Sequence, residues 1–325
     1  YLTAQLLWNP DQNPDLVMEG FCEAYYQEAA PFIQEYIYTI HAEIQEVPEF
    51  FLFLYGDPSQ GFDSFLRPEL LDTYDNLFTQ AEDAVSGNPE VLDRVRRARL
   101  STHYAILEAS RKGLTPDYQL SPQVRSRLET FQDICQSGRI TMMNEMRFTV
   151  DEYISSYEMA LVRASLPNIA AGKPVVLLTQ PKKYAGEDPQ VLTDGSLGGN
   201  SFYANWLGFE GNDLEAVIDL GQAEEISQVH TAFLKVTNHV VFFPEEVIIS
   251  YSTDNVNFQS LAARETEHPL RRGDKVNDIE YFDFQFEPIQ ARYVKVIARS
   301  MQEAPPWHHA AGLPSWIFCD EVILN

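Results

Sequence analysis

Apolar side chains recur at three- and four-residue spacings through the first half of the 325-residue chain, which is the period of a helix buried on one face. Helix-start signals support this pattern: Asn88 stands directly before Pro89, and Thr149 lies three residues before Glu152 as in a capping box. Short connections between such segments are typical of an antiparallel helical bundle. The sequence predicts about six helices, which begin near Pro14 and Ala30 and cover 68–85, 89–110, 122–138 and 153–165.

The period changes from 3.6 to 2 in the second half of the chain. Alternating apolar and polar residues occupy 217–221, 247–252, 282–286 and 293–298, with Gly, Asp and Asn between them. Short strands with this punctuation indicate an antiparallel β-sandwich or jelly roll. We therefore expect a two-domain chain, α then β, with a helical domain at 1–166, a linker at 167–173 and a sandwich at 174–325.

The charge balance excludes some partners. The chain has 23 lysines and arginines against 48 aspartates and glutamates, a net charge of −25. Because both halves are acidic, a nucleic-acid backbone or an anionic membrane surface would be repelled. No apolar run reaches the roughly 20 residues of a membrane-spanning helix. We expect neither a nucleic-acid partner nor a membrane span.

Cysteine usage gives little functional information. Cys22, Cys135 and Cys319 lie far apart and form no Cys/His spacing typical of a metal site. We interpret them as small buried hydrophobic residues, with one disulfide between two of them left open.

Ordered motifs in the second half resemble the factor V/VIII type C, or discoidin, domain. They run from Leu192-Thr193-Asp194-Gly195 through 206–221, 243–254 and 291–296 to the closing segment 316–322. This version of the domain is similar to the C-terminal domains of family-20 β-hexosaminidases and to family-32 carbohydrate-binding modules. The resemblance implies a galactose-binding-like jelly roll that binds glycan.

The same resemblance implies a structural calcium ion. In the family it usually sits in the loop after the Asp-Gly pair and is closed by an acidic residue near the C-terminus. The matching side chains here are Asp194 and Glu321, with the carbonyl of Leu192 and a group near Asn200 as further ligands. Calcium prefers several oxygen ligands, and the glycine-rich loop 195–200 can turn carbonyls inward. The alternative is that Asp194 caps a turn and Glu321 is a surface carboxylate.

Glycan binding needs an aromatic face and a few polar groups on loops held by a rigid scaffold. The residues that fit are Trp307, His309, Tyr203, Asn238 and Arg271. Two alternatives stay open. Trp307 stands beside prolines and can pack within its own loop, and Arg271 lies in a charged segment typical of a solvated loop. His308 and His309 are adjacent, which is a poor arrangement for holding one zinc ion.

The first 45 residues carry a second resemblance. The segments 1–11 and 21–30, with Trp8-Asn9-Pro10 and Tyr25-Tyr26, resemble domain-of-unknown-function family 4838. That family occurs in multi-modular, glycan-processing proteins of gut-type Bacteroidetes, where this region follows a barrel-like domain. The resemblance implies that an upstream glycoside-hydrolase-like barrel is the partner of the helical half.

We expect the non-catalytic C-terminal region of a secreted, periplasmic or cell-surface carbohydrate-active protein, with the sandwich binding glycan. The sequence has no phosphate-binding loop, nucleophile elbow or His-Glu-x-x-His motif, and no carboxylate pair is singled out among its acids. The alternative is that bundle and sandwich form a scaffold for the absent barrel and bind nothing themselves.

Overall fold

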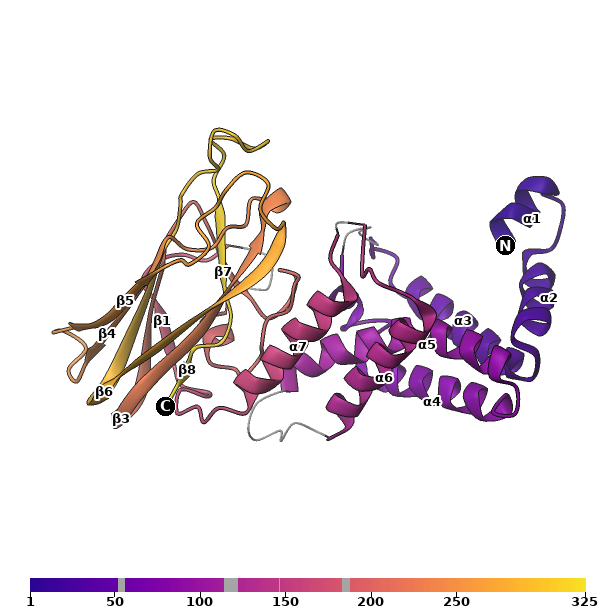
Figure 1. The fold of residues 1–325 in the computed structure, drawn as a ribbon, viewed down its shortest axis with the longest axis horizontal. Coiled ribbons are helices and arrows are strands. Elements are labelled where there is room, and N and C mark those ends of the chain that lie inside the picture. The colour runs from indigo at the N-terminus through magenta and orange to yellow at the C-terminus, as the bar shows by residue number, and fades with distance from the viewer. Residues whose placement is uncertain (52–55, 114–121, 146, 183–187) are drawn as a thin grey trace. The chain divides into compact units, whose positions relative to one another are not determined.

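A computed structural model describes residues 1–51, 56–113, 122–145, 147–182 and 188–325. The chain divides into two compact units (Figure 1). The helical unit consists of 1–109 and 124–141, and the sandwich unit consists of 110–123 and 142–325.

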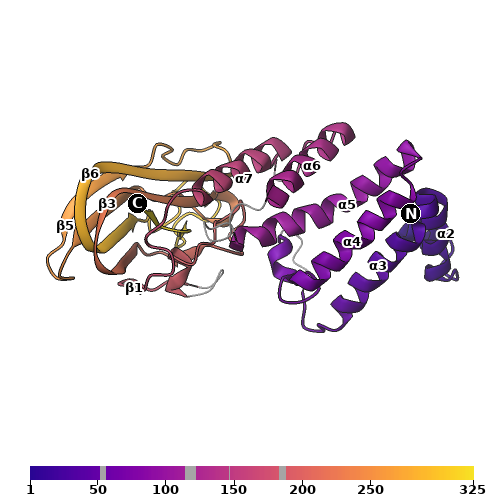
Figure 2. The same cartoon turned by 90° about the horizontal axis from the view of Figure 1, so that it is seen from below.

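The helical unit confirms the predicted helices. In Figure 2, α3, α4 and α5 lie alongside one another, and α3 packs against both α2 and α4. Its core includes Cys22, Ile33, Phe78 and Val95, all nearly inaccessible to solvent. The helices are α1 (Leu2–Trp8), α2 (Pro14–Tyr26), α3 (Ala30–Gln45), α4 (Pro68–Ala84), α5 (Pro89–Ser110) and α6 (Pro122–Gly138), with 3-10 turns at Gln27–Ala29, Pro58–Gly61 and Arg111–Gly113.

A charged network ties three helices of this unit together. Asp75 on α4 accepts hydrogen bonds from Arg99 on α5 at 2.7 Å and from Arg127 on α6 at 2.8 Å. Arg99 also donates to Glu82 at 2.8 Å. His103 is 4% exposed, and its Nδ1 lies 2.9 Å from the Arg127 guanidinium. Each of the two arginines therefore reaches a carboxylate on another helix.

Helix α7 (Val150–Ala164) belongs to the sandwich unit, which differs from the expected boundary. Its capping box forms as predicted, with the Glu152 amide donating to Thr149 Oγ1 at 3.1 Å and the Thr149 amide donating to Glu152 at 2.8 Å. Near its other end Arg163 is buried and donates to Asp320 at 2.9 Å. The expected linker 167–173 also lies within this unit, because Asn168 hydrogen-bonds both Glu321 and the Leu324 amide.

The sandwich is antiparallel, as predicted, and two long strands belong to both of its faces (Figure 1). The segment 214–219 of β3 pairs with 293–298 of β6, and 228–236 pairs with 277–285. Register shifts between these stretches bend both strands. The strands are β1 (Val175–Leu177), β2 (Leu207–Glu210), β3 (Leu214–Val236), β4 (Glu246–Ser252), β5 (Gln259–Glu265), β6 (Asn277–Arg299), β7 (Trp316–Cys319) and β8 (Ile323–Leu324).

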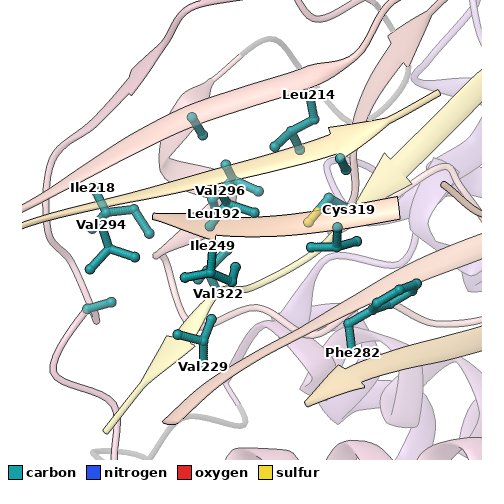
Figure 3. Close-up of a cluster of buried hydrophobic side chains, with 14 of the residues drawn as sticks. Leu192, Leu214, Ile218, Val229, Ile249, Phe282, Val294, Val296, Cys319 and Val322 are labelled. Atoms are coloured by element: carbon teal, nitrogen blue, oxygen red, sulfur yellow. The ribbon is translucent and has the colours of Figure 1, made fainter. Parts of the chain in front are cut away.

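One continuous apolar core fills the space between the faces (Figure 3). Leu214, Ile249, Phe282 and Val296 contribute to it from four different stretches of strand. Cys319 is also part of this core, which fits its interpretation as a small hydrophobic residue. All three cysteines are free and buried.

None of the helices in the described ranges is long and apolar enough to cross a bilayer.

Candidate functional site

Three segments meet beyond the end of β3. The 3-10 turn η5 (Thr237–His239) follows the strand directly. The Phe202 ring lies 5.3 Å from the His239 ring and 4.7 Å from the Tyr203 ring, centroid to centroid. Asn238 Oδ1 lies 3.3 Å from Nδ1 of His239. Two predicted glycan-binding residues, Tyr203 and Asn238, therefore come together around His239.

The loop 301–315 is the third segment. His308 donates from Nε2 to the Thr237 carbonyl at 2.8 Å, and its Nδ1 accepts from the Ala310 amide at 3.1 Å. The Nε2 bond holds the loop against η5, and the Nδ1 bond fixes the ring within the loop itself. The next residue, His309, is exposed, and its charge adds to the burial that lowers the pKa of His239. The His309 ring lies 4.2 Å from that of His308, which is itself bonded to η5.

Trp307 and Arg271 are placed less favourably. Trp307 is half-buried, with its ring 5.8 Å from that of His308. Arg271 is exposed, and its backbone amide donates to Asp274 at 2.9 Å. Within the described part of the chain, the Arg271 guanidinium forms no hydrogen bond or ion pair with the other predicted residues. Its neighbour Leu270, however, packs against the core of the 301–315 loop.

A cavity of about 510 Å³ opens beside these segments. Lys235 lies at the end of β3, is only 3% exposed and borders the cavity. Phe243, Leu270 and Met301 give it apolar walls, and its remaining lining consists of Glu245, Glu246, Glu265, Thr266, His268, Pro269 and Arg299. None of the residues predicted from the sequence to bind glycan lines this cavity. The feature that could have pointed to the cavity is Lys235 itself, a lysine within the segment 231–236, in which every residue is buried.

The loop expected to hold calcium is rigid and close-packed. Trp206 is fully buried and donates from its indole to the Gly199 carbonyl at 3.0 Å. A Cβ atom on Gly198 would lie 2.1 Å from the Trp206 ring, so only glycine fits there. Ser196 Oγ and Asn200 Oδ1 are buried, and neither finds a hydrogen-bond partner among the described residues. Two oxygen atoms of this loop are thus available to a cation.

Glu321 closes the loop from the C-terminal side. It is 2% exposed and accepts hydrogen bonds from the Gly195 amide and the Asn168 side chain, each at 2.8 Å. Burial raises the pKa of its carboxyl to about 8, although the Gly195 hydrogen bond lowers it. Glu321 is therefore not the surface carboxylate of the alternative interpretation.

The other two proposed calcium ligands, Asp194 and the Leu192 carbonyl, already accept hydrogen bonds from backbone amides. Asp194 is exposed, and its carboxylate accepts from the Ser196 amide at 2.8 Å. The Leu192 carbonyl accepts from the Val322 amide at 2.8 Å. Within the described ranges no three His, Cys, Asp or Glu side chains gather as a metal site. Calcium here would depend on the carboxylates of Glu321 and Asp194 together with carbonyl, hydroxyl and amide oxygens of the loop, a donor set that suits this ion.

The bent antiparallel sandwich, with a glycine loop closed by an acidic residue near the C-terminus, agrees with a known domain family. Residues 178–317 match the F5/8 type C domain. A second family model, a domain of unknown function called DUF4838, matches residues 1–38. Both resemblances seen in the sequence are thereby confirmed. No curated protein shows significant similarity to the chain.

Solved structures similar to the F5/8 type C region include carbohydrate-binding modules. Chitosan-binding module 1 of a Paenibacillus sp. IK-5 chitosanase/glucanase is 17% identical, with 49% of this chain and 99% of the module covered and a TM-score of 0.32. The fucose-binding module SpX-3 of Streptococcus pneumoniae is also 17% identical, with 49% and 98% covered and a TM-score of 0.32. A Clostridium perfringens module in complex with GlcNAc-α-1,4-galactose is 12% identical, with 49% and 93% covered and a TM-score of 0.33.

Proposed function

We propose that the sandwich unit binds glycan in the cavity beside Lys235. The observation that carries the proposal is the composition of this cavity, whose volume of about 510 Å³ falls in the ordinary range for small-ligand sites. Sugar hydroxyls both donate and accept hydrogen bonds, and a pyranose ring also presents an apolar face. The cavity offers an ammonium donor, carboxylate acceptors and apolar walls formed by Phe243, Leu270 and Met301.

The residues around His239 extend this proposed surface. Tyr203 and His309 offer aromatic rings, Asn238 an amide, and Trp307 the part of its indole that is accessible to solvent. Arg271 follows Leu270 on the cavity wall and offers an exposed guanidinium. A glycan longer than one sugar would contact these groups while one unit occupies the cavity.

A glycan array probed with the whole chain tests the proposal. We expect binding to a defined sugar class, and Leu270→Trp should abolish it because the larger side chain fills the cavity. Leu313→Trp is the matched control, since Leu313 is 58% exposed and does not line the cavity. Binding that survives Leu270→Trp would contradict the proposed site, and an array without any signal would contradict the function.

The alternative function is a scaffold without a ligand. It is favoured by the packing of the predicted aromatic residues, because Tyr203 packs against the cluster around Phe202 and Trp206, and Trp307 is half-buried. An empty array combined with a well-folded chain would support this alternative.

We further propose that calcium stabilises the loop 192–200 with ligands from Leu192, Asp194, Asn200 and Glu321. The unpartnered oxygens of Ser196 and Asn200, and the buried Glu321 carboxylate, support this proposal. When bound, the ion would hold the loop in one conformation and neutralise Glu321. A calcium-dependent rise in the melting temperature of the chain, lost in Glu321→Gln, is the expected result. Equal melting in calcium and in chelator would overturn it.

The parent protein in this proposal is secreted or cell-surface and multi-modular, with a glycoside-hydrolase-like barrel upstream of the helical unit. Exposed Leu7 and Trp8, at 82% and 89%, lie in the DUF4838-matching segment and support a covering partner there. Hydroxyl-radical footprinting should show Trp8 reactive in the 325-residue chain and protected in the longer protein. Equal reactivity in both would contradict a barrel packed on α1.

A further inference from the structure

Several buried or half-buried cations of the sandwich unit have a carboxylate partner, whereas Lys235 forms no ion pair with a described residue. Arg163 donates to Asp320, Arg292 to Asp219, and Arg264 lies near Glu280. The Lys235 ammonium makes no hydrogen bond or ion pair with any residue in the described ranges, although the chain has an excess of 25 negative charges. Its ammonium lies 4.9 Å from the centroid of the Phe243 ring. Asp278 lies opposite Lys235 in the β3–β6 ladder, and its charge raises the Lys235 pKa that burial lowers. A buried cation with carboxylates in its surroundings but no ion pair is only partly compensated, so it calls for an explanation.

The carboxylates nearest to Lys235 are already engaged. Asp278 accepts from Lys275 at 3.0 Å, and Asp274 accepts from the Arg271 amide at 2.9 Å. Glu280 accepts from the Thr266 hydroxyl at 2.6 Å and from the Glu267 amide at 2.8 Å. Arg299, the other strong cation on the cavity lining, is paired with Asp213 at 2.6 Å. Lys235 is therefore the cationic group of the cavity left without a carboxylate partner among the described residues.

The rest of the lining limits what can pair with this ammonium. Glu246 lies opposite Glu265 across β4 and β5, and both border the cavity together with Glu245. These carboxylates would repel a ligand with several negative charges, but they can accept hydrogen bonds from hydroxyls. The apolar side chains of Phe243 and Met301 suit the C–H face of a sugar ring. A ligand with one carboxylate and several hydroxyls fits the Lys235 ammonium, the glutamate acceptors and the apolar walls of the cavity.

We propose that the cavity takes a uronic-acid sugar unit whose carboxylate pairs with the Lys235 ammonium. This inference rests on the proposed glycan-binding function and names its substrate class. An ion pair of this kind, formed away from water, is a charge-assisted hydrogen bond and discriminates against the neutral parent sugar.

Titration calorimetry of the whole chain with matched ligands tests the inference. We expect D-glucuronate or D-galacturonate to bind about tenfold or more tightly than D-glucose or D-galactose. The uncharged methyl ester of the uronate should bind as weakly as the hexose. This comparison needs no variant. An ester that binds as tightly as the free acid would overturn the inference and leave glycan binding intact, whereas an absence of binding to any sugar would overturn both.

Lys235→Met tests the residue itself. The variant should lose the preference for the uronate and should melt at a higher temperature, because an unpaired buried cation is replaced by an apolar side chain of similar length. Lys295→Met is the matched control: Lys295 also lies over an aromatic ring, Phe258 at 4.2 Å, but does not line the cavity. A uronate preference that persists in Lys235→Met, or disappears in Lys295→Met, would contradict the assignment.

Discussion

The two units stabilise their internal charges in opposite ways. The helical unit contains a network of ion pairs in which each member is linked to at least one other, and the side chains remain 13–21% exposed. Its members are Asp75, Arg99, Arg127 and Glu82. In the sandwich unit Arg163 and Asp320 form one bidentate pair with side chains 7% and 0% exposed. A shared, partly hydrated network keeps partners when one member is lost. In the dry pair the loss of Arg163 leaves Asp320 without a counter-charge, with only the hydrogen bonds from the Gly198 and Ala232 amides.

The largest expected effect comes from breaking the dry pair. Arg163→Met should destabilise the sandwich unit by about 3–5 kcal/mol, since Asp320 would stay buried without a counter-charge. Arg292→Met is the control, because Arg292 and Asp219 are 40% and 31% exposed and a solvent-screened surface pair contributes little to stability. Urea unfolding followed by the fluorescence of buried Trp206 measures both. Equal losses would show that burial does not decide the cost.

A smaller effect is expected from pH in the helical unit. Burial, together with the neighbouring charges of Arg127 and Arg99, lowers the pKa of His103 to about 4. The unfolded chain therefore binds a proton near pH 6.5 that the folded unit binds only near pH 4. Stability should fall by up to about 3 kcal/mol as the pH drops through this window, and should not fall further on account of His103 below it.

His103→Gln should flatten this pH dependence, because glutamine does not titrate. His41→Gln is the control, since His41 is exposed in the same unit. Denaturation monitored by circular dichroism between pH 4 and pH 7 provides the measurement. A slope that is retained in His103→Gln would assign the acid sensitivity to another group.

The smallest expected effects come from two helix caps, one in each unit. Thr149 caps α7, and Asn13 caps α2 by accepting from the Asp15 amide at 2.8 Å. Alanine at either position should cost about 1 kcal/mol, because one helix-end amide loses its acceptor. Chemical denaturation of each variant gives the value. A cost of several kcal/mol for Thr149→Ala would mean that α7 anchors more of the sandwich than its cap alone.

Local signals made the fold predictable. Asn88 and Thr149 mark helix starts because their own side chains can cap the helix. The strands are marked by the alternation of apolar and polar residues within each strand. The assignment of α7 was not predictable in this way, because a helical period shows that one face is buried but not against what. The partner of Arg163 lies 157 residues away at Asp320.

The candidate site was less predictable, and for a related reason. Tyr203, Asn238 and His309 are brought together by contacts among three loops, and no spacing in the sequence encodes those contacts. Lys235 was missed because a lysine reads as a surface residue until its strand is known to be buried on both faces. By contrast, the position of Glu321 beside the glycine loop followed from the family resemblance.

The shared strands β3 and β6 also bear on how the sandwich forms. Leu214 pairs with Ala298 and Val236 with Asn277, so both faces depend on residues that are distant in the sequence. Neither face can assemble before the intervening chain has closed into a loop, and such topologies fold slowly, in milliseconds to seconds. Once the sandwich has formed, one face cannot unfold while the other stays intact, because β3 and β6 belong to both faces. The unit should accordingly fold late and resist partial opening by proteases.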